Sequence, residues 1–188
     1  MRPLATRITL ALLLVGGVSF TVAQQGNAAS AAGASSTFRL SSSAFAAGTE
    51  IPRQYSCKGA DTSPAVAWSG APAKTAAFAL IVDDPDAPHG TWVHWVLWNV
   101  PASAQGLPEG VPKHDSQPDG SLQGRNSDGK VGYNGPCPPS GQTHRYFFRL
   151  YALNGKLDLA PGADRSSLDA AMQGHILAQT EYMGTFHK

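Results

Sequence analysis

The stretch GYNGPCPPSGQTHRYFF, residues 132–148, places three prolines and three glycines directly in front of a run of aromatic residues. Proline lacks a backbone N–H and fixes φ, so this segment does not form a helix. Its rigidity also limits the entropy that it loses on ordering. We interpret it either as a stiff turn or as a preformed wall against which another group docks.

The sequence around this stretch predicts a β-rich domain. Residues 75–84, 91–100 and 144–153 are apolar, aromatic and β-branched runs, with Pro and Gly in the connections between them. Apolar runs of about eight residues indicate strands that are buried on both faces. Shorter strands are predicted at 36–42, 65–70 and 180–186.

One helix signal comes late in the chain, at residues 164–179. Leu168, Met172 and Ile176 recur at four-residue spacing, and either Asp164 or Ser166 is able to cap the N-terminus. The pattern therefore predicts a mainly β fold with one C-terminal helix.

The first 23 residues have the pattern of an export signal. Arg2 and Arg7 precede an apolar stretch that is too short to span a bilayer comfortably, and small residues before Gln24 suit a signal peptidase. An uncleaved membrane anchor is the alternative. We expect a signal peptide at 1–23, a disordered leader at 24–36 and a single domain at 37–188. The protein is then periplasmic or secreted, without stable membrane insertion after cleavage.

Charge and cysteine content narrow the function classes. Without Arg2 and Arg7 the chain keeps 12 of its 14 basic residues against 13 acidic ones, so its charge gives no reason to expect nucleic-acid binding.

Cys57 and Cys137 lie eighty positions apart. In an oxidising compartment such a pair first indicates a disulfide, although two free thiols or half of a metal site are alternatives.

Two polar clusters lie at the ends of predicted strands. Asp84 and Asp86 follow the first long strand, and a hairpin-like connection brings His94 of the next strand close to them. His144 and Tyr146 share one face of the third long strand. The structural alternative is that the aspartates cap backbone N–H groups of a turn and the histidines are hydrogen-bonded core residues.

Taken together, the clusters have the composition of a small-molecule pocket. Pro88, Trp92, Pro138 and Tyr146 supply apolar walls, with Asp and His side chains at the floor. No GxSxG or HExxH motif is present, and nothing indicates a nucleophile beside a base. We therefore predict no catalytic residue, no metal site and no cofactor, and rank a hydrolase using Asp86 and His94 lowest.

The motifs DPDAP followed by HW, and GPCPPSGQTHRYFFRLYAL, resemble the two signature regions of the phosphatidylethanolamine-binding protein family, in particular its bacterial Raf-kinase-inhibitor-like branch. SPAVAW and DAAMQGHILAQTEYMGTF are also similar to that branch, so the resemblance runs from about Phe38 to the end of the sequence. It implies a large antiparallel-type sheet packed on a smaller sheet. It also implies a pocket for small anions such as phosphate and phosphoethanolamine head groups.

Carried over position by position, the resemblance implies ten ligand-binding residues: Asp84, Asp86, Pro88, Trp92, His94, Gly135, Cys137, Pro138, His144 and Tyr146. Cys137 stands where eukaryotic members tend to carry glycine, which suggests a cross-link beside the pocket.

Carboxylates would repel an anion in this pocket, so we hypothesise that they hold His94 or His144 protonated. This hypothesis predicts tighter anion binding at about pH 5.5 than at about pH 8. We also expect a cis X–Pro bond in the stretch or at Ala87–Pro88.

These observations predict a non-enzymatic exported binding protein for a small anionic, phospholipid head-group-like ligand. The alternative is a protein-interaction module that inhibits an extracytoplasmic serine protease or another enzyme. Residues 103–135 form a long irregular connection, as functional or mobile loops do, and 103–130 would be the inhibitory loop.

Overall fold

The computed structural model describes residues 38–188 of the chain. The predicted signal peptide and leader lie outside the described residues. The large sheet has the strand order β6-β4-β3-β7-β8 and the small sheet the order β1-β2-β5, and every pairing is antiparallel. The large sheet consists of β3 (Ala77–Asp84), β4 (Trp92–Pro101), β6 (Leu122–Gln123), β7 (Thr143–Leu153) and β8 (Ile176–His187). The other elements are β1 (Arg39–Ser41), a 3-10 turn (Arg53–Tyr55), β2 (Val66–Ser69), β5 (Gly106–Leu107) and α1 (Arg165–Met172).

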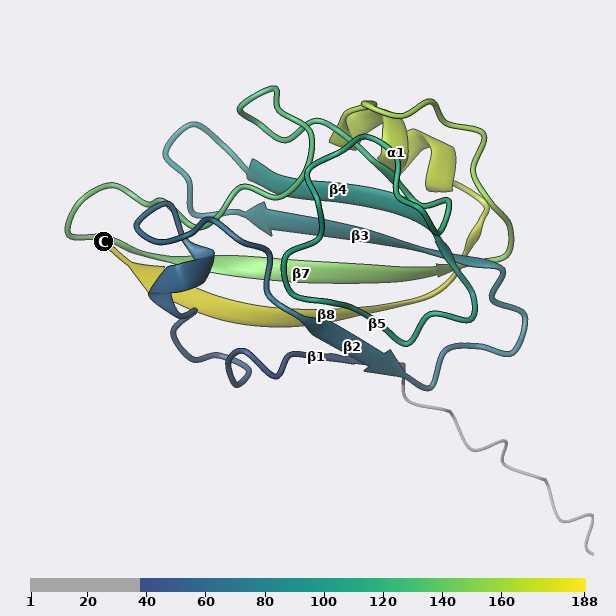
Figure 1. Cartoon of the computed structure of the whole chain (residues 1–188), viewed down its shortest axis with the longest axis horizontal. Coiled ribbons are helices and arrows are strands. Elements are labelled where there is room, and N and C mark those ends of the chain that lie inside the picture. Colours follow the sequence, from purple (N-terminus) through teal and green to yellow (C-terminus); the bar gives the residue numbers. More distant parts are fainter. Residues whose placement is uncertain (1–37) are drawn as a thin grey trace, which may run out of the picture. The chain divides into compact units, whose positions relative to one another are not determined.

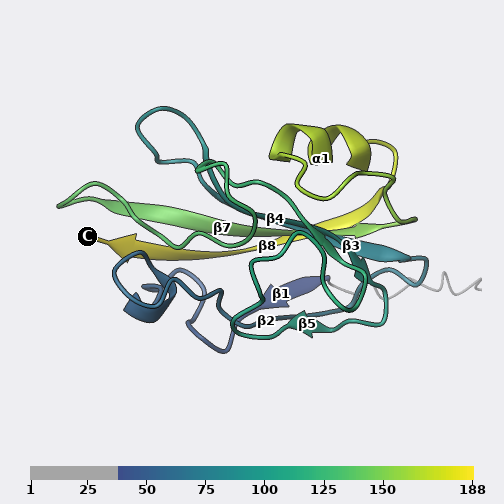
Figure 2. The ribbon, with the colours of Figure 1, turned by 45° about the horizontal axis from the view of Figure 1, so that its top comes forward.

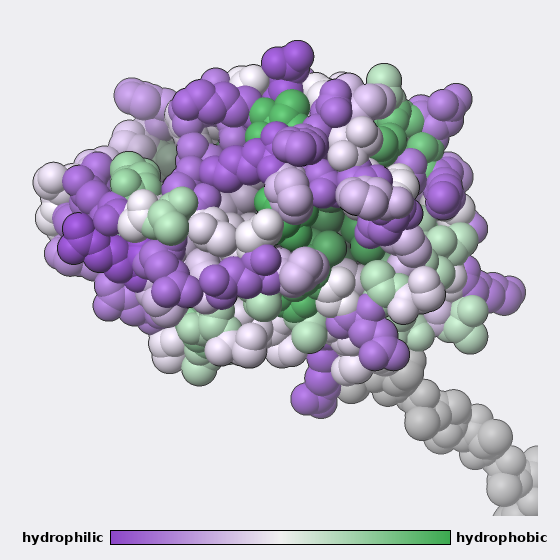
Figure 3. All heavy atoms as spheres, in the orientation of Figure 1, coloured by the Kyte–Doolittle hydropathy of each residue, from purple (hydrophilic) through white to green (hydrophobic). Residues whose placement is uncertain are grey.

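The large sheet lies between two covering layers. The small sheet covers one of its faces and α1 the other, as Figures 1 and 2 show. This arrangement confirms the predicted mainly β fold with a large sheet, a smaller sheet and a C-terminal helix. Hydrophilic side chains cover most of the face seen in Figure 3, and hydrophobic side chains show mainly between them.

β3 is buried along its whole length, as the predicted apolar run requires. Its side chains alternate between the two layers. Phe78, Leu80 and Val82 pack into the core beneath the small sheet. Ala79 and Ile81 pack into the core beneath α1. One strand therefore contributes to both cores.

The predicted helix at 164–179 is too long. Asp164 caps α1, since its Oδ1 accepts a hydrogen bond from the Ser167 backbone N–H at 2.8 Å. The helix ends at Met172, and Gly174 has a φ of 76°, the left-handed conformation that commonly follows a helix end. The next residues join β8, where Ile176 pairs with Leu153. The final strand is correspondingly longer than predicted.

The 132–148 stretch packs tightly against residues 55–61. A Cβ added at Gly135 would lie 2.8 Å from the Ser56 Cα and would also collide with the Tyr55 carbonyl oxygen. The Gly135 backbone N–H donates to Asp61 Oδ1 at 2.6 Å. These contacts support the interpretation of the stretch as a preformed wall.

A disulfide between Cys57 and Cys137 joins the same two segments, as predicted. Beside it, the Cys57 backbone N–H donates to the Pro136 carbonyl oxygen at 3.1 Å. All peptide bonds in residues 38–188 are trans, so the expected cis X–Pro bond is wrong. The trans isomer is the intrinsically preferred one for X–Pro bonds.

Gly135→Ala tests the close packing of this wall. We expect the substitution to lower the thermal unfolding midpoint and to cost about 1–3 kcal/mol, as overpacking of a filled site does. Gly155→Ala is the matched control, because the nearest atom to an added Cβ there is His175 Nδ1 at 3.8 Å. Equal midpoints for the two variants, measured by circular dichroism, would contradict the contact.

Candidate functional site

A cavity of ≈ 660 Å³ opens between the β3–β4 connection, the 132–148 stretch and the disulfide. Seven of the ten predicted ligand-binding residues line it: Asp84, Pro88, Trp92, His94, Cys137, Pro138 and His144. The sequence motifs therefore do meet at one place. Trp92 is 37% exposed at this cavity, whereas the other three tryptophans are buried in the cores.

His94 is brought to the cavity by an irregularity in the large sheet. Trp95 pairs with Val82 and Val93 pairs with Asp83, so His94 has no partner on β3. Such bulges redirect side chains and are common next to functional sites. The bulge also frees the His94 carbonyl oxygen, which accepts the Asn134 N–H at 2.9 Å.

The His94 side chain makes a second contact with the same residue. Its Nδ1 lies 2.7 Å from the Asn134 carbonyl oxygen, and because a carbonyl only accepts, Nδ1 carries the proton. Burial lowers the pKa of His94, so the ring is neutral at pH 7. His94 therefore does not supply the positive charge that our hypothesis allowed it to carry.

Asp84 and His144 form a buried pair at the floor of the cavity. His144 Nδ1 lies 2.8 Å from Asp84 Oδ2, and both side chains are about 5% exposed or less. The other oxygen, Asp84 Oδ1, accepts the Asp86 backbone N–H at 2.8 Å. His144 Nε2 lies 3.0 Å from Oε1 of the exposed Gln142. Both oxygens of the Asp84 carboxylate thus have hydrogen-bond partners, and Asp84 orients the His144 imidazole.

Asp86 does not line the cavity. Its two oxygens accept from Arg145 Nε at 2.9 Å and from Arg145 Nη2 at 2.6 Å, and Oδ2 also accepts the Arg145 backbone N–H. The hydrogen bonds from Arg145 lower the pKa of Asp86 to about 2. Asp86 therefore ties the β3–β4 connection to β7 and lies beside the cavity without facing it.

Gly135 and Tyr146 also lie behind the cavity surface. Gly135 is in the wall, and Tyr146 packs edge-on against the His94 ring at a centroid distance of 5.2 Å. Burial, and then the negative charge of Asp84, raise the pKa of Tyr146. The Tyr146 hydroxyl is buried close to the Asp84 carboxylate and the Cys137 backbone, and hydrogen bonding to both also affects its pKa.

Sequence reasoning missed six polar residues that line the cavity: His89, Thr91, Ser127, Asp128, Asn134 and Lys188. Asn134 belongs to the quoted stretch, and its position between Tyr133 and Gly135 could have marked it. Asp128 and Lys188 carried no signal, because they lie outside both motifs. Within residues 38–188, no group of three or more His, Cys, Asp or Glu is placed to hold a metal ion.

A larger cavity of ≈ 820 Å³ lies on the α1 side of the large sheet. Arg149 and Arg165 both pair with the buried Asp83 there, at 3.1 and 2.6 Å. Its lining contains three arginines and three aspartates, so the formal charges cancel. The cavity at Asp84 is the better candidate for an anion site, because it joins the two signature motifs.

The comparisons with known proteins show the family to which the chain belongs. Residues 41–187 match the family model described as phosphatidylethanolamine-binding protein. The chain belongs to that family. Family membership implies a fold that binds anions or phospholipid head groups, and the family is generally regarded as non-catalytic. The resemblance seen in the motifs is thereby confirmed.

Relatives and solved structures cover most of the chain. A UPF0098 protein of Methanothermobacter thermautotrophicus is 48% identical over 149 residues, which is 79% of this chain and 98% of the relative. A phosphatidylethanolamine-binding protein homolog from Chlamydia trachomatis has a TM-score of 0.75 and 39% identity, covering 82% of this chain and 99% of that one. YbcL of E. coli, described as a new member of the mammalian family, has a TM-score of 0.75 and 32% identity over 80% and 98% of the two chains.

The lowered pKa of His94 predicts how stability depends on pH. An unfolded histidine titrates near pH 6.5, but folded His94 binds its proton only at lower pH. The unfolded state therefore binds more protons in that window, and the free energy of unfolding should fall as the pH drops below about 6.5. Urea unfolding of the wild type and of His94→Gln, measured between about pH 5 and pH 8, checks this.

We expect the stability difference between these two proteins to shrink as the pH falls. A difference that stays constant over this range would contradict a depressed His94 pKa. Asp86 does not interfere, because its pKa of about 2 places its contribution in a more acidic window, below the ordinary range of aspartate.

Proposed function

We propose that this protein is a non-enzymatic, exported binding protein whose cavity at Asp84 takes a small anion, such as the phosphate of a phospholipid head group. The buried Asp84–His144 pair is the observation that carries the proposal. In the imidazolium form both ring nitrogens donate, one to Asp84 and the other toward an acceptor at the cavity. Gln142 Oε1 occupies that acceptor position at 3.0 Å, on a side chain exposed enough to be displaced.

The cavity offers little for covalent catalysis. Its two cysteines are joined in the disulfide, so neither provides a thiolate. The hydroxyl oxygen of Ser127, another lining residue, accepts the Val93 backbone N–H at 2.8 Å, and no histidine bonds to it in the described residues. Binding is therefore favoured over hydrolysis.

Protease inhibition by the 103–130 segment has weaker support. Gln123 is completely buried, and its Nε2 donates to the carbonyl oxygens of Pro112 and His114 at 2.6 and 2.7 Å. Its Oε1 accepts from the Trp95 indole. Gln123 thus joins the 103–130 segment to β4 by a buried hydrogen bond, whereas an inhibitory loop needs to be extended and exposed.

Export is part of the proposal because of the disulfide. Structural disulfides persist in oxidising compartments, and Cys57–Cys137 closes a loop of eighty residues. No helix in residues 38–188 is long and apolar enough to cross a membrane. Detection of the mature protein in a periplasmic or culture fraction, by mass spectrometry of its N-terminus, would test both the signal peptide and its cleavage.

His144→Ala tests the anion site directly. We expect titration of the oxidised wild type with phosphate or phosphoethanolamine to give saturable NMR shifts around both signature motifs. Loss of one charge-assisted hydrogen bond should weaken binding roughly tenfold or more. His114→Ala is the control, since this exposed histidine does not line the cavity. Absence of saturable shifts in the wild type at millimolar phosphate would refute the proposal.

The pH dependence of binding tests the charge of His144. Sulfate is the suitable probe, because its charge stays constant while that of a phosphate monoester changes near pH 6. We expect sulfate to bind more tightly at about pH 5.5 than at about pH 8, as Asp84 holds the imidazolium toward the cavity. The other charged or titratable groups near the site are His89, which is exposed and lines the cavity, and Asp86, Asp128 and Lys188. His89→Ala should therefore keep the pH dependence, and His144→Ala should lose it. A flat profile would exclude His144 as a charged donor.

A further inference from the structure

The charges around the cavity are unevenly compensated. Asp84 is paired with His144, and His94 is held neutral by burial. Asp128 adds an exposed carboxylate, whose Oδ2 accepts from Asn134 Nδ2 at 2.8 Å. With these groups alone, the cavity would be neutral to negative and would repel an anion. A further positive charge is needed for the site to attract one.

Lys188 is the only lysine or arginine among the described residues that line the cavity. Its backbone is held on both sides by the 132–148 stretch. The Lys188 N–H donates to the Gln142 carbonyl oxygen at 3.2 Å, and the Gly141 N–H donates to the Lys188 carbonyl oxygen. In the adjacent pair of β8 and β7, His187 lies opposite Thr143. The Cα of Lys188 is thereby fixed at the rim of the cavity.

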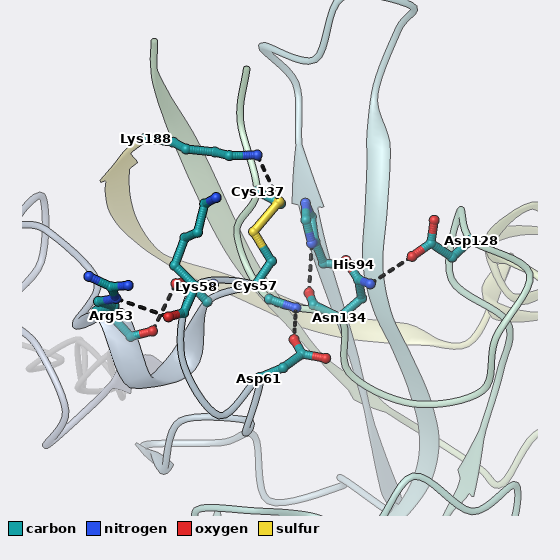
Figure 4. Close-up of a disulfide and its surroundings, with 11 residues drawn as sticks. Arg53, Cys57, Lys58, Asp61, His94, Asp128, Asn134, Cys137 and Lys188 are labelled. Carbon is teal, nitrogen blue, oxygen red and sulfur yellow. Dashed lines mark hydrogen bonds between the residues drawn. A yellow bond between two sulfur atoms is a disulfide. The ribbon is translucent and has the colours of Figure 1, made fainter. Parts of the chain in front are cut away.

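The Lys188 side chain extends from this rim along the disulfide. Its Nζ lies 3.4 Å from Cys137 Sγ, as Figure 4 shows. Sulfur is a weak acceptor, and an ammonium group has three N–H donors. No carboxylate in the described residues forms a salt bridge with this Nζ. The ammonium therefore retains donors and charge for another partner.

The charges of Lys188, which is half-buried, and of Asp128, which is exposed, lie apart from each other. In Figure 4, Lys188 and Asp128 lie on opposite sides of His94. An anion that approaches the disulfide side meets the ammonium and stays away from the Asp128 carboxylate. The disulfide side is also the side to which the quoted stretch contributes Pro138 and Pro139.

We infer that Lys188 is the charge partner that determines anion affinity in this cavity. The inference rests on the proposed anion site and adds to it a residue outside both signature motifs. His144 orients the anion through a hydrogen bond, and Lys188 supplies the net attraction. The chemical class that this pairing recognises is a compact oxyanion, such as sulfate, phosphate or a phosphate monoester.

The test compares three lysine variants with the wild type, with sulfate as the probe and NMR titration as the readout. Lys188→Met removes the charge and keeps the length of the side chain, and Lys188→Arg keeps the charge. Lys58→Met is the matched control, because Lys58 adjoins the other cysteine of the disulfide but does not line the cavity. Each variant is first compared with the wild type in its thermal midpoint.

We expect Lys188→Met to weaken sulfate binding about tenfold at low ionic strength, since a unit charge in direct contact is lost. Lys188→Arg should stay within about threefold of the wild type, and Lys58→Met within about twofold. Added sodium chloride should weaken wild-type binding more than it weakens the Lys188→Met variant.

Different failures have different meanings. If the wild type and Lys188→Met bind sulfate equally, the inference about Lys188 is wrong and the anion site stands. The inference also fails if Lys188→Arg lowers sulfate affinity as much as Lys188→Met does, because the size and shape of the side chain would then matter and its charge would not. If Lys58→Met weakens sulfate binding as much as Lys188→Met does, the loss reflects the net charge of the protein, and the inference about Lys188 is wrong. No binding to the wild type would refute the site itself.

Discussion

Burial of β3 on both faces is the constraint on which the two covering layers depend. Because side chains alternate along a strand, Asp83 and Asp84 at its end belong to different layers. Each buried carboxylate needs partners, since an isolated buried charge is costly. Asp83 forms salt bridges with Arg149 and Arg165 on the α1 side, and Asp84 pairs with His144 on the other side. A single strand end thus organises both cavities, and their different partners give them different chemistry.

The wall formed by residues 132–148 is fixed before any ligand arrives. Gly135 is held by Asp61, Asn134 exchanges two hydrogen bonds with His94, and Cys137 is bonded to Cys57. These contacts reach the 55–61 segment and β4, which lie far from the wall in sequence. Ordering a loop on binding costs free energy, so a wall that is already ordered keeps more of the interaction energy for affinity. The prolines of the stretch also restrict the conformations of the unfolded chain, which stabilises the folded wall.

Much of this arrangement could be predicted from local patterns. The run 75–84 contains β3, the cysteine pair forms the disulfide, and most of the residues predicted from the two motifs line one cavity. The helix was extended too far, because apolar spacing continued through Gly174 while strand pairing with β7 determined the real structure. Asp86 looked equivalent to Asp84, since no local signal shows that Arg145 lies within reach of it. Lys188 was missed for the same reason, because long-range pairing of β8 places it.

The composition of the rim indicates what a ligand needs besides its anionic group. Lys188, at the solvent-open rim, attracts an oxyanion only weakly, because water and salt screen a charge there. The same rim carries Pro88, Pro138 and the partly exposed Trp92, which is one of only three large hydrophobic side chains exposed in residues 38–188. An aromatic ring at a pocket mouth contributes most when apolar surface covers it. Free phosphate leaves this surface bare, so under the proposed function a phosphorylated molecule whose remaining atoms cover Trp92 should bind more tightly than phosphate alone.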